Sequence, residues 1–289
     1  MIVSASYRTD IPAFYGEWFL GRLKAGEAWV RNPYGGKPNR VALSVPEVDG
    51  FVFWTRNSAP FAAALTAVEA MGLPYVVQYT VTGYPRALET GVASAEHASA
   101  QIATLSARRG RAAVVWRYDP ILFSDLTSPD WHWRNFTHLA RALSPYVDEV
   151  TVSFAHMYRK TVRNLKTAAA AGNFDWRDPD DDERRSFLAE LATIATDYGL
   201  RLTVCSQPTL EQEGVGAAAC IDAERLSRVA GHPVTARQKG NRPGCLCAES
   251  RDIGAYDSCA HGCVYCYAVR DHAKAREAVR ENDALSVTL

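Results

Sequence analysis

The chain has 289 residues, and 47% of them are hydrophobic, which is enough for one large core or two modest ones. Lys plus Arg (32) equals Asp plus Glu (32), so the overall charge gives no strong signal for a nucleic-acid partner. No apolar run approaches the roughly 20 residues of a membrane helix, and the first residues lack a signal-peptide pattern. We therefore expect a cytoplasmic protein with no membrane partner.

Short apolar runs rich in β-branched and aromatic residues alternate with segments of helical periodicity. The runs predict strands at Ile2–Ala5, Phe51–Thr55, Tyr75–Val81, Ala113–Arg117, Glu149–Phe154 and Leu200–Cys205. Helices are predicted at about 11–24, 59–71, 94–109, 131–144, 158–171 and 182–198, with a small hairpin around Trp29–Arg31 and Val41–Val45. Strand-then-helix repetition predicts an α/β fold with a full or partial parallel (β/α) barrel, and an open doubly wound sheet is the alternative.

The sequence changes character after Leu210, where regular periodicity weakens and Gly, Ala and Cys become more frequent. We divide the chain into a barrel body, 1–210, and a Cys-rich segment, 211–289, that completes the same domain and ends in a helical pattern from about Cys266 to Asn282. All seven cysteines lie between Cys205 and Cys266. An odd number of cysteines in a reducing compartment argues against a disulfide framework and favours metal chemistry.

Polar side chains follow each predicted strand, at the end where parallel barrels carry their chemistry. Several strands that end in charged or amide groups predict a polar pocket, which favours an enzyme. The residues are Ser6, Arg8 and Asp10; Arg56 and Asn57; Gln78, Thr80 and Thr82; Arg117 and Asp119; Ser153, His156 and Lys160; and Ser206 and Gln207.

Three cysteines, Cys259, Cys263 and Cys266, are spaced as C-x3-C-x2-C. Three thiolates from one tight loop can hold three irons of a [4Fe–4S] cluster and leave the fourth iron open to a small molecule. Gly262 lets the loop turn at low steric cost, and Tyr265 adds an aromatic ring beside the cluster. The alternative is a zinc site that includes His261 and a second knuckle at Cys245-Leu-Cys247.

This spacing, with an aromatic residue before the third cysteine, resembles the radical S-adenosylmethionine superfamily. The resemblance implies a cluster that binds S-adenosylmethionine and yields a 5′-deoxyadenosyl radical, with an electron donor such as flavodoxin or ferredoxin. The triad usually follows the first barrel strand, so its late position implies a permuted barrel in which a strand near Ile253–Tyr256 precedes the loop. The ending Cys263–Tyr267 also looks, over a short stretch, like the spore photoproduct lyase group.

Nearly the whole chain resembles the bacterial DUF1848 family, a likeness that implies the fold and the cluster but no substrate. The matching stretches are Ser4–Tyr15, Arg31–Pro33, Phe53–Asn57, Trp116–Pro120, Cys220–Asp222 and Asp252–Tyr256.

Individual roles follow from side-chain chemistry. Arg117 and Lys160 are candidates for the carboxylate of S-adenosylmethionine or of an anionic substrate. Asp10 and Asp119 could accept hydrogen bonds from ribose hydroxyls or a substrate amine. Asp10 is also a natural helix cap, and Arg117 with Asp119 could form a structural salt bridge. We add Arg8 to this catalytic set, and we assign cofactor binding to Tyr265, Arg56, Asn57, Gln78 and Thr82.

Four cysteines remain outside the triad, namely Cys205, Cys220, Cys245 and Cys247. Four thiolates are the number that closes a second [4Fe–4S] site. The alternatives are buried apolar thiols at Cys205 and Cys220, and zinc or disulfide chemistry at Cys245 and Cys247.

Three functions are compatible with these patterns. The first is a radical S-adenosylmethionine enzyme acting on a small-molecule or nucleotide substrate. The second is a non-catalytic iron–sulfur redox sensor, and the third is a zinc-stabilised barrel enzyme.

Overall fold

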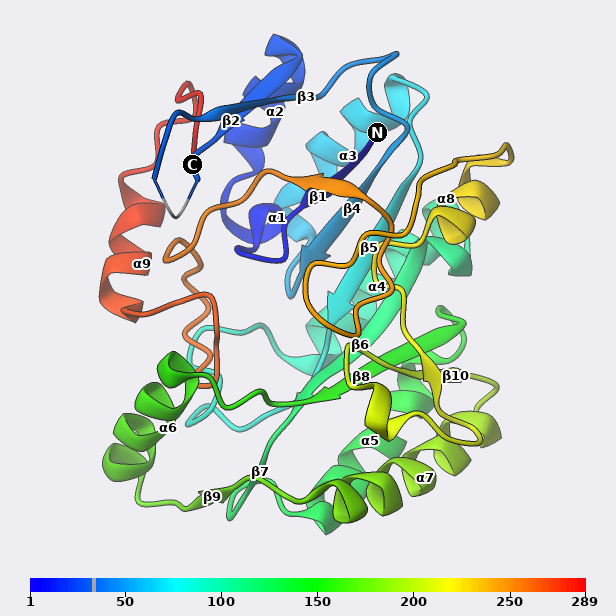
Figure 1. Cartoon of the computed structure of the whole chain (residues 1–289), viewed down its shortest axis with the longest axis vertical. Helices are drawn as coiled ribbons and strands as arrows, with labels where there is room; N and C mark the ends of the chain where they lie inside the picture. Colours follow the sequence, from blue (N-terminus) through cyan, green and yellow to red (C-terminus); the bar gives the residue numbers. More distant parts are fainter. Residues whose placement is uncertain (33–34) are drawn as a thin grey trace.

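A parallel sheet of eight strands forms the centre of the molecule (Figure 1), as seen in a computed structural model that describes residues 1–32 and 35–289. Pro33, which ends one of the stretches used above, lies outside the described residues. The strand order is β11 (Gly216–Ala217), β10 (Arg201–Val204), β8 (Glu149–Phe154), β6 (Val114–Ile121), β5 (Tyr75–Thr80), β4 (Gly50–Thr55), β1 (Ile2–Ala5) and β12 (Ser250–Asp252). Every neighbouring pair is parallel.

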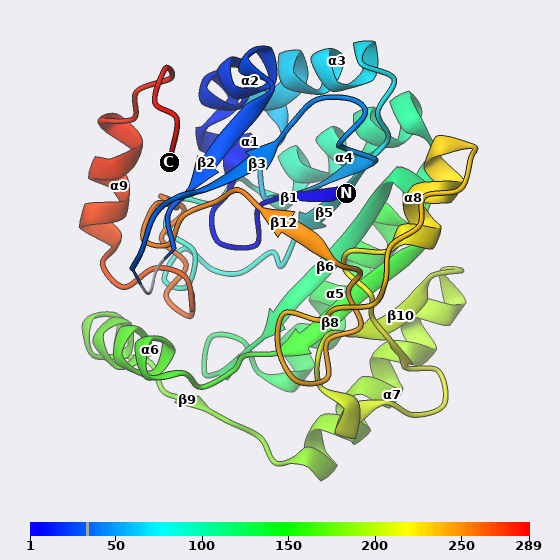
Figure 2. The same cartoon turned by 45° about the horizontal axis from the view of Figure 1, so that its top comes forward.

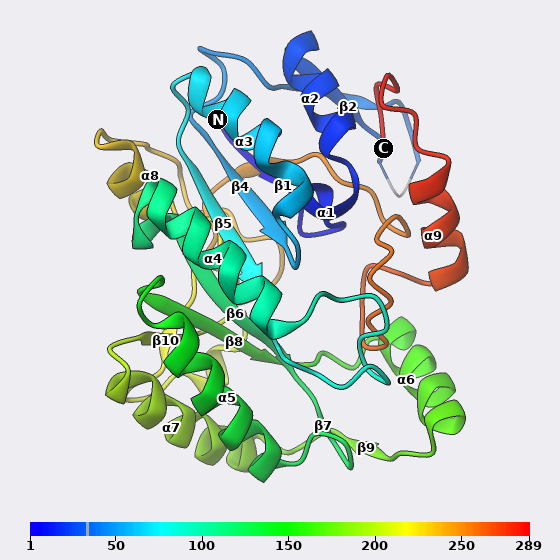
Figure 3. The ribbon, with the colours of Figure 1, turned by 180° about the vertical axis from the view of Figure 1, so that it is seen from behind.

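Helices cover one face of this sheet. Seen from behind (Figure 3), α3, α4 and α5 lie across the strands, whereas α6 and α9 stand to one side. Within the described residues, none of the helices combines the length and the apolar character that a bilayer crossing requires. The helices are α1 (Ile11–Phe14), α2 (Gly16–Ala25), α3 (Ala62–Ala70), α4 (Ala95–Arg109), α5 (Pro129–Leu143), α6 (Arg159–Gly172), α7 (Asp181–Asp197), α8 (Ala223–Ala230) and α9 (His272–Arg280).

Smaller elements complete the chain. An antiparallel hairpin joins β2 (Glu27–Val30) to β3 (Asn39–Ala42), where the sequence predicted one. A second short pair joins β7 (Phe123–Ser124) to β9 (Trp176–Arg177). Three 3₁₀ turns lie at Ala59–Phe61, Arg111–Ala113 and Pro208–Leu210.

Both faces of the sheet are buried, because successive residues of a strand point to opposite sides. On the helical face, Phe51 and Phe53 pack edge-on against Phe19 of α2, with ring centroids 5.7 and 5.5 Å apart. On the other face, Val52 joins an apolar cluster that includes Ile221 and Leu226. The Cys-rich segment therefore forms the second layer of the core.

The first and last strands of the sequence lie side by side (Figure 2). β12 pairs with β1 in register Ser4↔Asp252, and β4 pairs with the opposite edge of β1. The chain order is therefore rotated with respect to the spatial order, with a C-terminal strand placed before β1. In the described part of the chain no pairing joins β11 to β12, so the architecture is an open parallel α/β sheet rather than a closed barrel.

Two predicted boundaries near the C-terminus are wrong. The strand expected at Ile253–Tyr256 lies earlier, because the Asp252 carboxylate accepts the hydroxyls of Ser4 and Ser6, both at 2.8 Å, where the chain turns away from β1. The helix expected from Cys266 starts at His272, because Asp271 caps the backbone N–H groups there. Both corrections lengthen the loop that carries the cysteine triad.

A buried arginine fastens α8 to the sheet. Arg225 is 2% exposed and forms ion pairs with Asp148 at 2.8 Å and Glu149 at 2.5 Å. Arg225→Met removes two charge-assisted hydrogen bonds, although Arg201 still pairs with Glu149 at 2.5 Å. We therefore expect the free energy of unfolding to fall by about 2 kcal/mol in urea denaturation. Arg228→Met is the matched control, because Arg228 is half exposed and reaches Asp148 only at 3.5 Å. Its expected loss is below about 1 kcal/mol, and equal losses would contradict this role of burial.

Candidate functional site

A cavity of about 820 Å³ opens at the carboxyl ends of the strands. Its lining includes the triad Cys259, Cys263 and Cys266, together with the four remaining cysteines. Of the other predicted site residues, Arg8, Asp10, Arg56, Arg117, Asp119, Lys160 and Tyr265 also line it. One cavity therefore brings together residues that are far apart in the sequence, such as Arg8 and Cys266, which are separated by 258 positions.

The loop that carries the triad is held by backbone hydrogen bonds to the segment after β5. Cys263 forms an antiparallel bridge with Glu89. The Gly91 N–H donates to the His261 carbonyl at 2.8 Å, and the Val264 N–H donates to the Leu88 carbonyl at 3.0 Å. These bonds fix the loop by its backbone and leave the thiols for chemistry.

Asp10 anchors the same loop from the opposite side. Its Oδ2 lies 2.7 Å from His261 Nε2 and accepts the Arg56 backbone N–H at 2.7 Å, while Oδ1 caps the Ala13 N–H of α1. His261 and Asp10 are both buried. Asp10 is therefore occupied by protein partners and acts as a positioning residue for the loop.

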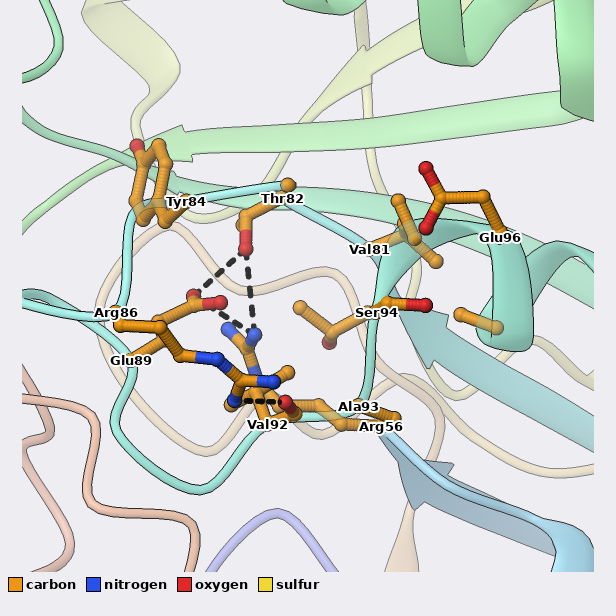
Figure 4. Close-up of a pocket in the computed structure, with 14 residues that line it drawn as sticks. Arg56, Val81, Thr82, Tyr84, Arg86, Glu89, Val92, Ala93, Ser94 and Glu96 are labelled. Carbon is orange, nitrogen blue, oxygen red and sulfur yellow. Dashed lines mark hydrogen bonds and ion pairs between the residues drawn. The ribbon is translucent and has the colours of Figure 1, made fainter.

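A second buried network lies behind Cys263. Arg56 donates from Nη1 to Glu89 Oε1 and from Nη2 to the Tyr265 hydroxyl, both at 2.8 Å, and Thr82 donates to Glu89 at 2.6 Å. Figure 4 shows Arg56, Glu89 and Thr82 converging beside a smaller cavity of about 250 Å³. Burial lowers the pKa of Arg56, but the charges of Glu89, Tyr265 and Cys263 outweigh it and hold that pKa well above its usual range.

The triad thiols lie in a largely desolvated environment. Burial raises the pKa of Cys263 to about 12, against the lowering effect of Arg56. Burial also raises the pKa of Cys266, while two backbone N–H groups and the charges of Arg56 and Lys160 lower it. A cation at this position would displace the thiol protons, since the thiolate is the form that binds metals.

Among residues 1–32 and 35–289, no group of three or more His, Cys, Asp or Glu side chains is arranged to hold a single metal ion. His261, a ligand in the zinc alternative, is engaged with Asp10. A [4Fe–4S] cubane needs a different arrangement of ligands from that of a single ion. Each thiolate binds its own iron, so the sulfurs need not converge on one point.

Two of the cations that line the cavity lie beside the Tyr256 ring. The Lys160 ammonium lies 5.2 Å from the centre of the Tyr256 ring, and the Arg8 guanidinium lies 5.3 Å from the same ring. Arg8 also reaches Asp252 at 3.7 Å. Within the described residues no hydrogen bond or ion pair engages Lys160, so its ammonium is available to an anionic ligand group.

Arg117 and Asp119 form an ion pair, as the structural alternative predicted. Three predicted cofactor-binding residues, Asn57, Gln78 and Thr82, are absent from the described lining of the large cavity. Gln78 donates to the Cys220 carbonyl at 2.8 Å, and Asn57 accepts from Gln101 at 2.9 Å. All three side chains form hydrogen bonds with other protein groups, and Thr82 lines the smaller cavity.

Two important residues escaped the sequence reasoning. Glu89 lies in a loop without a motif, so nothing local marked it. Asp252 lies within a stretch that resembles the family, and this is the signal that could have identified it. In the structure it joins β12 to the loop after β1, where it also accepts the Tyr7 N–H at 3.1 Å.

Gly262 in the triad loop has a left-handed backbone conformation, with φ at +73°. A Cβ there would overlap the Thr90 hydroxyl oxygen. We expect Gly262→Ala to lower the free energy of unfolding by about 2 kcal/mol or more, from backbone strain and steric overlap together. In Gly262→Ala/Thr90→Ala the overlap is gone and only the strain of about 1–2 kcal/mol remains. Urea denaturation of both single variants and the double variant checks this, and complete recovery in the double variant would remove the strain argument.

Comparison with known proteins identifies a family. No curated protein sequence matches the chain. A crystal structure of a "putative alpha-L-fucosidase" from Bacteroides thetaiotaomicron VPI-5482 matches at 13% identity with a TM-score of 0.24, covering 82% of this chain and 56% of that one. The chain thus spans little more than half of that protein, and so low a score carries no argument. The profile of the family described as "Domain of unknown function (DUF1848)" matches residues 2–268, and the chain therefore belongs to the DUF1848 family.

Proposed function

We propose that this protein is a radical S-adenosylmethionine enzyme whose [4Fe–4S] cluster is held by Cys259, Cys263 and Cys266. The observation that carries the proposal is the position of this C-x3-C-x2-C loop, which lines a large cavity at the carboxyl ends of a parallel sheet. An iron–sulfur cluster with one open iron supplies a site for S-adenosylmethionine and, on reduction, a 5′-deoxyadenosyl radical.

The strand order supports a permuted form of the superfamily's barrel. β12 precedes the triad loop in sequence and lies beside β1 in space. In space, the strand that leads into the cysteines is followed by β1, β4, β5, β6, β8 and β10. A circular permutation, in which the chain ends are moved to another loop, would give this order. The late position of the triad is then compatible with the superfamily's usual geometry.

The chain's own residues have separable tasks in this proposal. Arg56 places buried positive charge behind Cys263 and offsets the negative charge of a thiolate. Lys160, whose charge acts on Cys266, is positioned to bind the carboxylate of S-adenosylmethionine. The Asp10–His261 contact holds the loop in place, and the half-enclosed cavity limits water around the reacting groups.

The size of the cavity bounds the substrate. A volume of about 820 Å³ lies in the upper part of the range for ligand pockets, roughly 300–1,000 Å³. Since S-adenosylmethionine would fill part of it, the remaining space suits a small molecule or a single nucleotide. An electron donor such as flavodoxin or ferredoxin would act from outside the cavity.

Anaerobic purification followed by reconstitution with iron and sulfide tests the proposal. We expect brown protein with at least about four irons per chain and 5′-deoxyadenosine on addition of S-adenosylmethionine and dithionite. S-adenosylmethionine should also change the electron paramagnetic resonance spectrum of the reduced cluster. Colourless protein with stoichiometric zinc would reject the proposal. A loaded cluster without any response to S-adenosylmethionine would favour the redox sensor.

A further inference from the structure

The four cysteines outside the triad come from three separate segments. Cys205 follows β10, Cys220 follows β11, and Cys245 and Cys247 lie in the irregular segment before β12. All four line the large cavity. Cys205, Cys220 and Cys247 are also buried, at 7%, 3% and 4% exposure.

Their side chains form one connected group. Cys205 Sγ and Cys220 Sγ are 3.4 Å apart. Cys247 shifts the pKa of Cys220, and Cys245 shifts that of Cys247, so each is a neighbour of the next. Every cysteine of the chain that is not in the triad is therefore part of one contiguous group, which we call the four-cysteine group.

Hydrogen-bond donors point at this group. Arg117 Nη1 lies 2.9 Å from Cys220 Sγ, and the Ile221 N–H donates to Cys247 Sγ at 3.3 Å. Arg242 Nη2 lies 3.6 Å from Cys205 Sγ. Within the portion that the structure describes, no carboxylate lies within ion-pair distance of Arg242, so its positive charge is available to sulfur anions. Donors of this kind stabilise thiolates and tune metal–thiolate centres.

The backbone around the group is built to bring the segments together. A bridge between Gln238 and Ala248 folds the segment back on itself, and the Ala248 N–H donates to the Ile221 carbonyl at 2.8 Å. Gly240 packs so closely on Cys245 that a Cβ would clash with its backbone. Such contacts hold Cys245 and Cys247 against the segment that carries Cys220.

We propose that Cys205, Cys220, Cys245 and Cys247 hold a second [4Fe–4S] cluster that is closed by four thiolates. This site does not depend on the proposed function, because it uses none of the triad cysteines.

The arrangement favours a cluster over a single zinc ion. Zinc at about 2.3 Å from each sulfur requires every pair of sulfurs to be about 3.8 Å apart. Cys205 Sγ and Cys220 Sγ are closer than this, at 3.4 Å. A cubane binds each thiolate at a different iron, and all four cysteines line a cavity of about 820 Å³ that has room for one.

Iron analysis of three variants tests the site. After anaerobic reconstitution we expect about eight irons per chain in the wild type, from two cubanes of four irons each. Cys245→Ser/Cys247→Ser should lower this to about four, and so should Cys263→Ser, each by loss of a different cluster. Leu246→Ala is the matched control, because this exposed side chain lies between the two cysteines. Its iron content should stay at about eight.

The outcomes separate the two proposals. If the wild type holds about four irons and only Cys245→Ser/Cys247→Ser loses them, the four-cysteine site stands and the proposed function fails. If Cys245→Ser/Cys247→Ser keeps all its iron, or loses one zinc per chain instead, the second cluster is excluded. A Cys205–Cys220 disulfide in anaerobically purified protein would exclude it as well. Native mass spectrometry of the wild type counts the clusters directly, so the test holds even if a variant does not fold.

Discussion

Cys263→Ser is expected to abolish formation of 5′-deoxyadenosine, lowering its rate by more than about 100-fold. Loss of an outer-shell partner alone typically costs 10–100-fold in metal affinity or activity, and this change removes a ligand. The backbone contacts that hold the loop, such as the Val264 N–H to the Leu88 carbonyl, do not use the thiol. The fold should therefore survive while the cluster is lost. Iron content and 5′-deoxyadenosine are measured on the same anaerobic samples.

Ala260→Ser is the control for this experiment. It adds a hydroxyl to the same loop without removing a thiol, so iron content and 5′-deoxyadenosine formation should stay close to the wild type. Undiminished cofactor cleavage in Cys263→Ser would show that the catalytic cluster lies elsewhere. Equal loss in both variants would point to a general sensitivity of the loop.

The central strands could be predicted from the sequence because their signal is local. β1 and β8 match the predicted ranges, and β4, β5, β6 and β10 contain most of theirs. Strands buried on both faces appear in the sequence as short, nearly continuous apolar runs, which is a clear local pattern. The helical segment predicted at 11–24 is divided at Tyr15, where the backbone leaves helical geometry between α1 and α2. β11 has two residues and β12 three, too few for any periodicity to appear.

The candidate site was predictable where spacing alone carries the chemistry. The triad is such a case, because three cysteines in eight residues must lie on one loop. Arg56 was expected to bind a cofactor, but its guanidinium is engaged by Glu89, a residue 33 positions away. Thr82 likewise turns toward Glu89. The sequence of either segment alone does not reveal such pairings, because they depend on where the β5 loop meets the triad loop.

The four-cysteine group also shows that contacts between distant segments cannot be predicted from spacing in the sequence. The count of four predicted a closed site, but only the spatial order β8–β10–β11 brings Cys205 and Cys220 into contact. Arg117 was expected to bind a carboxylate in the cavity. Its Nη1 atom lies 2.9 Å from Cys220 Sγ, so Arg117 also contacts the four-cysteine group. The spacing of residues in the sequence does not predict this contact.

Breaking the buried Arg56–Glu89 pair on one side should cost more stability than breaking any other ion pair described near the triad. Glu89 is 3% exposed and accepts hydrogen bonds from Arg56, Thr82 and Tyr265. Glu89→Gln keeps the shape but leaves the Arg56 charge buried without its counterion. Breaking a buried pair in this way costs about 3–5 kcal/mol. We expect that loss in urea denaturation of anaerobic protein matched for iron content.

Two further variants decide whether charge is the cause. Glu190→Gln makes the same chemical change at an exposed position of α7 and should alter the free energy of unfolding by less than about 0.5 kcal/mol. Arg56→Met/Glu89→Leu removes both charges and replaces them with apolar groups, which is often neutral or stabilising at buried pairs. The double variant should therefore be more stable than Glu89→Gln, even though it loses more hydrogen bonds. If it is less stable, the geometry of the network and not its charge holds the segment after β5 against the triad loop.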